Sequence, residues 1–274
     1  MVGAGAGTQC LPLYRYIPRP DRSPHAPGSG ELSARNETNV GQSIAEDLSG
    51  FQRVENITDW ALGQFQKHYK QTLRDSKSLR VSEKREITKE DIFHYVYAVL
   101  HHPAYRVKYE INLKREFPRI PFYEDFHQWA EWGKGLMELH LNYESVEPFA
   151  LERVEHPHSN PPPLRYAPGA IVPQGEGVHP TTRLMARKDK GEIEIDTQTT
   201  LRGVPAEAWE YRLGTYSALE WILERYKEKK PKDPMIAEKF NTYRFADYKE
   251  QVIVLLDRVC TVSVETMKIV KEMP

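Results

Sequence analysis

Apolar positions in the middle of the chain recur every three or four residues, which is the spacing of an amphipathic helix. Asn56 or Thr58 can cap the first such helix, and its predicted apolar face carries Ile57, Trp60, Ala61, Phe65 and Tyr69. The chain before it differs, because residues 10–16 read CLPLYRY, a short apolar run rich in strand formers. We therefore expect a strand at Cys10–Tyr16, a disordered start at residues 1–9, and a flexible loop at residues 17–52.

Further helices are predicted in the same block. Residues 74–86 are charged and are expected to form a solvated connection. Thr88 is then followed three residues later by Asp91, as in a capping box, and it opens a helix with Ile92, Phe93, Val96, Val99 and Leu100 on its core side. Pro103 interrupts that pattern. Two more helices follow, one at Tyr105–Phe117 and one at about Tyr123–His140 with Phe126, Trp129, Leu136 and Leu139 inside.

The second half of the chain has a different pattern. Residues 146–180 are rich in proline and glycine, which favours a long surface loop, with its flexible part at residues 154–180. Short runs with turn residues between them predict an antiparallel meander of strands at Glu192–Asp196, Thr199–Val204 and Trp209–Leu213. Ser217 can cap a helix that ends near Lys230. A long helix is predicted at Phe245–Lys271, and its β-branched run, Val259–Val264, leaves a break or a strand open there.

These patterns together predict an α+β fold, in which a helical scaffold packs with a small, mainly antiparallel sheet and a long C-terminal helix. The chain has 274 residues, 39% of them hydrophobic, which suits one large domain or two small ones. It has no apolar run of the roughly 18 residues that span a membrane, and its start lacks the features of a signal peptide. We therefore expect a cytoplasmic protein with no membrane partner.

Charge and cysteine content narrow the function classes. The formal net charge is −1, which is evidence against a protein that coats nucleic acid without specificity. A DNA-binding role would need a local basic surface or help from another domain. The two cysteines, Cys10 and Cys260, are too few for a disulfide framework or a structural zinc site.

Motifs for catalysis are missing from the sequence. It has no Gly-x-Ser-x-Gly nucleophile elbow and no phosphate-binding Gly-x-x-x-x-Gly-Lys-Ser/Thr loop. The pairs His101–His102 and His156–His158 are candidate metal ligands without acidic or thiolate partners at suitable spacing. A structural role is favoured for the first pair, at a helix C-terminus, and a place in a solvent-exposed loop for the second. We expect no catalytic residue, no bound metal and no cofactor in this chain.

One local cluster of cations stands out. Basic residues accumulate just before the first predicted strand of the meander, and one more lies on the next strand: Arg183, Arg187, Lys188, Lys190 and Arg202. Lysine and arginine at a loop and sheet edge can contact phosphates, and arginine can bind guanine with two hydrogen bonds. The alternative is a solubilising surface on an exposed hairpin, which is the commoner role of a charged run.

Several long segments resemble one protein family. They read CLPLYRY, ENITDWALGQFQKHY, ITKEDIFHYVYAVLHHPAYRVKYEINLKREFPRIPF, LMELHLNYE, YRLGTYSALEWILERY and DRVCTVSVETMKIVKEMP. In this order they are similar to the C-terminal specificity domain of type ISP restriction–modification enzymes. The resemblance covers residues 10–274 apart from the variable loops, and it identifies that range as a target-recognition domain.

The resemblance implies double-stranded DNA as the partner. In such enzymes a nuclease, an ATP-driven translocase and an adenine methyltransferase that uses S-adenosylmethionine precede the specificity domain, so ATP, Mg²⁺ and S-adenosylmethionine are implied for the parent enzyme only. The residues around Arg183–Lys190 depart most from the family pattern, as a base-contacting element would. Two other functions stay open: a helical scaffold that docks a partner enzyme without touching DNA, and a hydrolase that uses His156 and His158.

Overall fold

The computed structural model describes residues 12–18, 51–75, 85–156, 180–228 and 243–274. The expectations for residues 1–9, for most of the loop at 17–52 and for nearly all of the loop at 154–180 fall outside these ranges. The chain divides into two compact units, of which the first contains residues 1–100 and 104–133 and the second contains residues 101–103 and 134–274.

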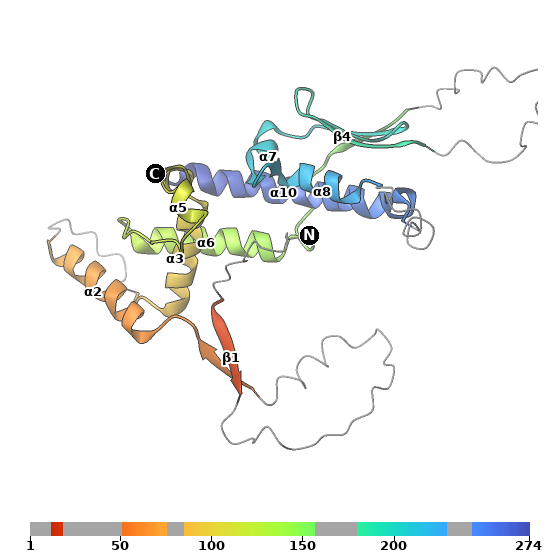
Figure 1. Cartoon of the computed structure of the whole chain (residues 1–274). Helices are drawn as coiled ribbons and strands as arrows, with labels where there is room; N and C mark the ends of the chain where they lie inside the picture. Colours follow the sequence, from red (N-terminus) through yellow and green to blue (C-terminus); the bar gives the residue numbers. More distant parts are fainter. Residues whose placement is uncertain (1–11, 19–50, 76–84, 157–179, 229–242) are drawn as a thin grey trace, which may run out of the picture. The chain divides into compact units, whose positions relative to one another are not determined.

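The first unit is mainly helical (Figure 1). Its elements are a hairpin of β1 (Tyr14–Pro18) and β2 (Phe51–Glu55), then α2 (Asp59–Asp75), α3 (Lys89–His101), α4 (Pro103–Lys108), α5 (Glu110–Leu113) and the first half of α6 (Phe126–Leu141). β1 and β2 are antiparallel, with Tyr14 opposite Glu55 and Pro18 opposite Phe51.

Two predictions in this unit are wrong at the ends of elements. The strand continues to Pro18, and Phe51 and Gln52 also belong to a strand, so the ends of the expected loop are paired. Pairing between segments so far apart in sequence leaves no local signal in either of them. The helix predicted at Tyr105–Phe117 is instead α4 and α5, separated at Tyr109 and finished at Leu113.

The cap predicted at Thr88 is confirmed. Its hydroxyl oxygen accepts a hydrogen bond from the backbone N–H of Asp91 (3.1 Å), and the Asp91 carboxylate accepts one from the backbone N–H of Thr88 (3.0 Å). This reciprocal arrangement satisfies N–H groups that the first turn of a helix leaves unpaired. Thr58 caps α2 with a single bond, because its hydroxyl oxygen accepts from the backbone N–H of Ala61 (3.2 Å).

An aromatic core holds the first unit together. Tyr95 of α3 is fully buried and stacks on Phe126 of α6, with ring centroids 5.0 Å apart. The two helices approach so closely that a Cβ added to Gly133 would lie 1.8 Å from the carbonyl oxygen of His94. Trp60, expected on the core side of α2, is 75% exposed. It lies in the first turn, and helical spacing does not show where along a helix the packing begins.

The second unit is an antiparallel sheet packed on helices. Its elements are the rest of α6, β3 (Glu152–Glu155), β4 (Thr182–Arg187), β5 (Glu192–Asp196), β6 (Thr199–Arg202), α7 (Ala206–Glu210), β7 (Arg212–Leu213), β8 (Tyr216–Ser217), α8 (Ala218–Tyr226), the 3-10 helix η2 (Phe245–Tyr248) and α10 (Lys249–Glu272). The strand order is β3-β6-β5-β4, and β7 and β8 form a separate hairpin.

The predicted meander needs correction. β5 has the expected bounds and β6 the expected start, but Trp209–Leu213 is not a third strand: it covers the end of α7, then Tyr211 and β7. Pro205 is the residue just before α7, has an extended backbone conformation, and its carbonyl accepts from the N–H of Ala208 (3.1 Å). The neighbours of β5 and β6 are β4 and β3 instead, and β3 includes Val154 and Glu155 of the expected loop.

The helices of this unit begin near where the sequence predicts. Ser217 caps α8 with a complete capping box to Glu220, although α8 ends at Tyr226 rather than near Lys230. The long helix begins as η2 and continues unbroken through Val259–Val264 to Glu272. β-Branched residues lower helix stability by only a few tenths of a kcal/mol each, and burial of Val259 and Val262 offsets that cost.

The core of the second unit lies between one face of the sheet and the helices α8 and α10. Ile193, Ile195 and Leu201 from the sheet pack with Leu219 of α8 and Leu256 of α10, all of them 1% exposed or less. The α+β architecture with its long C-terminal helix is therefore confirmed. Among the described helices, none combines the length and apolar character needed to cross a bilayer.

Candidate nucleic-acid interface

The predicted basic residues lie on the strands of the four-stranded sheet and on the turn between two of them. Arg183 and Arg187 are on β4, which is an edge strand, and Arg202 is at the end of β6. Along β5 the buried Ile193 and Ile195 alternate with the partly exposed Glu192 and Glu194. Alternate residues of a strand point to opposite faces. The glutamates therefore lie on the face away from the helices, which we call the outer face.

The outer face pairs its arginines with these glutamates. Glu194 binds two of them, because its Oε2 accepts from Arg183 Nη1 (3.1 Å) and its Oε1 accepts from Arg187 Nε (2.9 Å). These bonds, led by the one from Arg187, hold the pKa of Glu194 below its usual value. The Nε of Arg202 donates to Glu192 Oε1 at 2.8 Å. Three predicted DNA contacts are thus brought together, and two carboxylates partly neutralise them.

The lysines lie at the turn between β4 and β5. Lys188 Nζ is 2.8 Å from Glu220 Oε1 and 5.9 Å from the ring centroid of Trp209. Burial alone would raise the pKa of Glu220, but hydrogen bonds from Lys188 and Ser217 hold it below its usual value. Lys190 is exposed, and no ion pair is found for it within the described ranges. The turn is therefore anchored to the N-terminal end of α8 by one lysine and presents the other to solvent.

A bulge interrupts β4 in the middle of this cluster. The register shifts between Thr182 and Met185, and the buried Leu184 has a φ of 44°. A leucine in this left-handed region costs about 1–3 kcal/mol, and such strain is commonly found at functional sites. Bulges redirect side chains, and here Arg183 and Arg187 both reach the same carboxylate.

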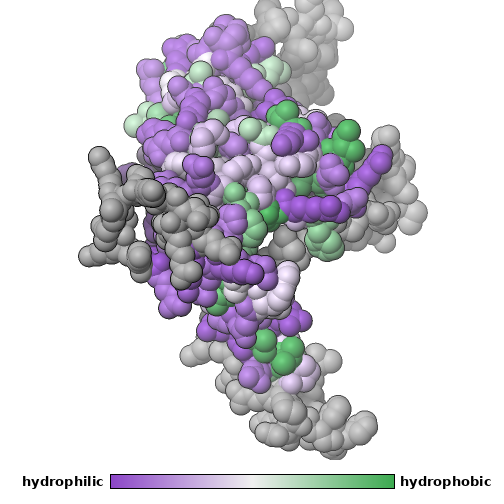
Figure 2. All heavy atoms as spheres, turned by 90° about the vertical axis from the view of Figure 1, so that its left-hand side faces the viewer, coloured by the Kyte–Doolittle hydropathy of each residue, from purple (hydrophilic) through white to green (hydrophobic). Residues whose placement is uncertain are grey.

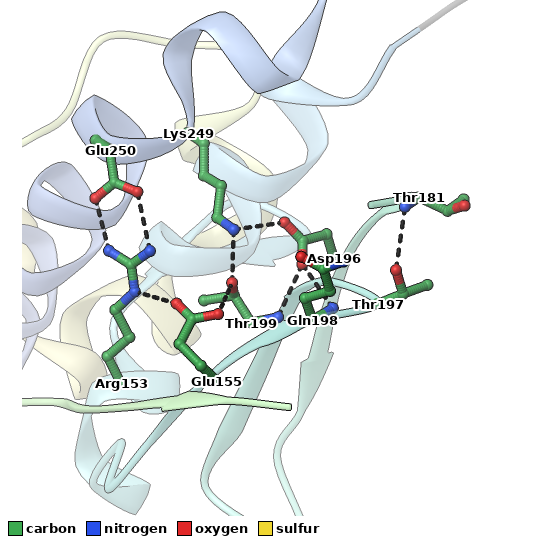
Figure 3. A network of polar contacts seen from close by, with 9 residues as sticks. All are labelled: Arg153, Glu155, Thr181, Asp196, Thr197, Gln198, Thr199, Lys249 and Glu250. Carbon is green, nitrogen blue, oxygen red and sulfur yellow. Dashed lines mark hydrogen bonds and ion pairs between the residues drawn. The ribbon is translucent and has the colours of Figure 1, made fainter. Parts of the chain in front are cut away.

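A polar network at one end of the sheet holds it against α10 (Figure 3). Lys249 Nζ lies 2.8 Å from Asp196 Oδ2 and 2.6 Å from Thr199 Oγ1. Asp196 Oδ1 accepts the backbone N–H groups of Gln198 and Thr199, both at 2.8 Å, which closes the turn from β5 to β6. The N–H of Thr181 donates to Thr197 Oγ1 (3.1 Å), so the start of β4 is tied to the same turn.

Arg153 adds a second connection in the same network. Its Nη1 and Nη2 donate to the two carboxylate oxygens of Glu250, at 2.6 and 3.0 Å, and its Nε donates to Glu155 (2.6 Å). A bidentate arginine–carboxylate pair fixes geometry as well as charge. β3 is thereby joined to α10, and the sheet that carries the outer face has a rigid support (Figure 3).

Sequence analysis missed the two glutamates of this surface and two arginines elsewhere in the second unit. The glutamates of β5 were not singled out, although their alternation with isoleucine was a visible signal. Arg212 and Arg225 were also missed. Arg225 lies over the Trp221 ring at 4.8 Å, Arg212 bonds a backbone carbonyl, and neither has an acidic partner in the part of the chain that the structure describes.

The histidine candidates are not brought together. His156 Nε2 lies 3.2 Å from Thr200 Oγ1, and His158 falls outside the described residues. His102 Nε2 lies 2.7 Å from the backbone oxygen of Pro274. Beside His101, burial lowers the pKa of His140 to about 4. Over the described ranges, no group of three or more His, Cys, Asp or Glu side chains is placed to hold a metal ion.

Comparison with known proteins gives the family. The model of the type ISP C-terminal specificity domain matches residues 1–255. The chain therefore belongs to this family of specificity domains, as the sequence resemblance predicted. No curated protein matches the chain.

Solved structures give the same relationship. The chain is 53% identical to part of a cryo-EM structure of a DrdV–DNA complex, with a TM-score of 0.67, over 81% of this chain and 20% of that one. A DNA-bound structure of the ATP-dependent type ISP enzyme LlaBIII is 21% identical, with a TM-score of 0.59, over 96% of this chain and 13% of that one, and it supports the fold alone. This chain thus spans a fifth or less of the length of these proteins.

Proposed function

We propose that this chain is the sequence-specific DNA-recognition module of a restriction–modification enzyme, and that the outer face of its four-stranded sheet contacts base edges. The proposal is carried by one observation. In a chain that belongs to the family of specificity domains, three arginines on one sheet face are 43–49% exposed and are held by carboxylates: Arg183, Arg187 and Arg202. The DNA complex of the 53%-identical DrdV supports double-stranded DNA as the partner.

Arginine suits this role because its planar guanidinium can donate two parallel hydrogen bonds to O6 and N7 of guanine in the major groove. Contacts to phosphates add affinity without sequence information. We assign the second task to Lys190, which is exposed at the turn, and to Lys188, whose ammonium group would be shared between a phosphate and Glu220. The arginines would choose the sequence, and the lysines would fix the position of the module on the duplex.

The chemistry would take place elsewhere in the parent enzyme. An adenine methyltransferase that uses S-adenosylmethionine would flip the target base out of the duplex, and a translocase and nuclease would use ATP and Mg²⁺. In this proposal the chain is not itself an enzyme and works in the cytoplasm, where it holds the target DNA in position for those modules. Its net charge of −1 is consistent with shared electrostatic work.

Selection from a pool of random duplexes tests the proposal. The full chain is used alone and with a cognate methyltransferase supplied, and the enriched sequence is then bound in a gel-shift assay. Arg183→Ala with Arg187→Ala should weaken binding to the enriched sequence and reduce its advantage over random DNA. Lys268→Ala on α10 removes an ion-paired cation that is 63% exposed and lies away from the outer face, and it should change neither. Unchanged affinity and preference in the arginine double variant would refute the assignment.

A protein-docking scaffold is the second candidate, and one observation favours it. Around α4 and α5, the apolar side chains of Val107, Ile111 and Phe117 are 78%, 69% and 63% exposed. Such groups often mark protein interfaces. On the face that Figure 2 draws, hydrophobic residues form small separate groups among hydrophilic ones. Photocrosslinking to a labelled duplex separates the candidates, because a scaffold predicts no base crosslink from the outer face.

A further inference from the structure

The two glutamates of the outer face bind the arginines in a specific way. Arg187 and Arg202 each donate their Nε–H to a carboxylate of β5, at 2.9 and 2.8 Å. We propose that Glu194 and Glu192 are positioning residues that orient these guanidinium groups for guanine. The inference rests on the proposed DNA-recognition function and adds to it the residues that determine how sharply bases are distinguished.

The geometry leaves the correct edge of each guanidinium available. A guanidinium is planar and carries five N–H donors in a fixed fork. When the carboxylate takes the Nε–H, rotation of the plane is restricted and the Nη1 and Nη2 groups remain at the far end. Within the described residues, no further side-chain hydrogen bond is found for the guanidinium group of Arg187 or of Arg202. Those ends carry the pair of donors that guanine O6 and N7 accept.

The glutamates are more buried than the arginines they bind, as a positioning role requires. The side chains of Glu194 and Glu192 are 18% and 20% exposed, whereas those of Arg187 and Arg202 are 43% and 44% exposed. Both glutamates are on β5, which is paired on one side with β4 and on the other with β6. The acceptors are therefore fixed in the sheet, and the donors they hold extend toward solvent.

The register of β4 and β5 shows that Arg187 does not bind the glutamate that lies directly opposite it. Met185, not Arg187, lies opposite Glu194, and Arg187 lies opposite Glu192. Arg187 therefore reaches diagonally along β5 to Glu194, which leaves Glu192 to Arg202, its opposite residue on β6. Each of these Nε–H groups has its own carboxylate, and the strained bulge at Leu184 places Arg183 on the remaining oxygen of Glu194.

Ordering an arginine before binding increases affinity for the correct base, because the entropy of its side chain has already been lost. It also penalises the wrong base, since a fixed donor pair cannot turn toward another acceptor. A carboxylate close to DNA repels phosphates, and this unfavourable effect acts on every sequence equally. The positioning role and a simple charge-balancing role therefore predict opposite effects when the glutamate is removed.

The test compares Glu194→Ala with Glu194→Gln in the full chain, using the sequence enriched by the wild type and a random duplex. Alanine removes the acceptor, so preference for guanine at the affected base pair should fall about tenfold. Glutamine removes the charge but keeps an oxygen that accepts from Nε, so most of the preference should remain. Both variants should bind random DNA more tightly than the wild type does.

Two controls accompany the comparison, and two outcomes would overturn it. Glu207→Ala removes an exposed charge from α7 and should leave the preference unchanged, and thermal melting verifies that each variant is folded. Equal loss in the alanine and glutamine variants, or no loss in either, overturns the positioning role while the proposed function stands. If the wild-type chain enriches no sequence, either alone or with the methyltransferase supplied, the proposed function itself fails, and the inference fails with it.

Discussion

Replacing Lys249 by methionine would remove the cation that neutralises Asp196 at the end of β5. The Asp196 side chain is 3% exposed and that of Lys249 is 17% exposed, with 2.8 Å between Nζ and Oδ2. Methionine keeps most of the apolar stem of lysine, so the change isolates the charge. It leaves a buried carboxylate that still accepts two backbone N–H groups, from Gln198 and Thr199.

The cost follows from that remaining charge. Removing one partner of a buried ion pair costs about 3–5 kcal/mol because the other charge is left without compensation. The two backbone hydrogen bonds still stabilise Asp196, so we expect the lower end, ~3 kcal/mol. In a protein of this size, that corresponds to a fall in Tm of roughly 6–12 °C. Lys249→Met with Asp196→Asn should recover much of the loss, since no buried charge remains.

Urea unfolding, followed by both fluorescence and circular dichroism, measures the effect. Burial opposes ionisation of Asp196, but the bonds from Lys249 and the two backbone N–H groups hold its pKa below the usual value. A lowered folded-state pKa stabilises the protein above the unfolded pKa of about 3.9, and this contribution disappears as the pH falls through the folded value. The difference between wild type and Lys249→Met should therefore be largest near neutral pH and shrink below about pH 4. A loss under ~1 kcal/mol at pH 7, the range of exposed ion pairs, would refute the reasoning.

Four further substitutions have defined outcomes. Gly133→Ala would place a methyl group 1.8 Å from the carbonyl oxygen of His94 and should lower Tm strongly. Gly63→Ala, with open space around it, should stabilise α2 by about 0.5–1 kcal/mol. Equal Tm values for the two variants would contradict the close approach of α3 and α6. Ser217→Ala removes the cap of α8 and should cost about 1 kcal/mol in urea unfolding, so a change within error would show that the cap is dispensable. Lys190→Ala should reduce the slope of log affinity against log salt by about 1 if this lysine neutralises a phosphate, and an unchanged slope excludes that contact.

Local signals were sufficient for the starts of several elements. Thr88 and Ser217 each precede an acidic residue by three positions, and both open helices with the expected caps. The short strand-like run at Glu192–Asp196, with turn residues after it, gave β5 with its observed bounds. A cap or a strand-like run lies within a few residues of sequence, and its physical cause is equally local. Such features are therefore readable without the rest of the fold.

Features that depend on distant partners were not readable. β3 lies beside β6, more than forty residues later, as in the pairing of Val154 with Thr200, and nothing near Val154 indicates it. Trp60 has the spacing of a core residue but is exposed. The sequence also did not show that the basic cluster is partly neutralised. The register of β4 and β5 brings the carboxylate of Glu194 to Arg183, eleven positions earlier in the chain.

The neutralised arginines suggest which parts of the enzyme supply affinity for DNA and which supply sequence specificity. A face with unpaired cations would attract any duplex, because phosphates are present in every sequence. On this outer face the carboxylates of Glu192 and Glu194 reduce that attraction, while the outward ends of Arg187 and Arg202 keep their donors. Affinity would then come from lysines such as Lys190 and from other modules, and the sheet would contribute mainly discrimination. An overall charge of −1 is consistent with such a division, since a module that selects sequence gains nothing from binding all DNA tightly.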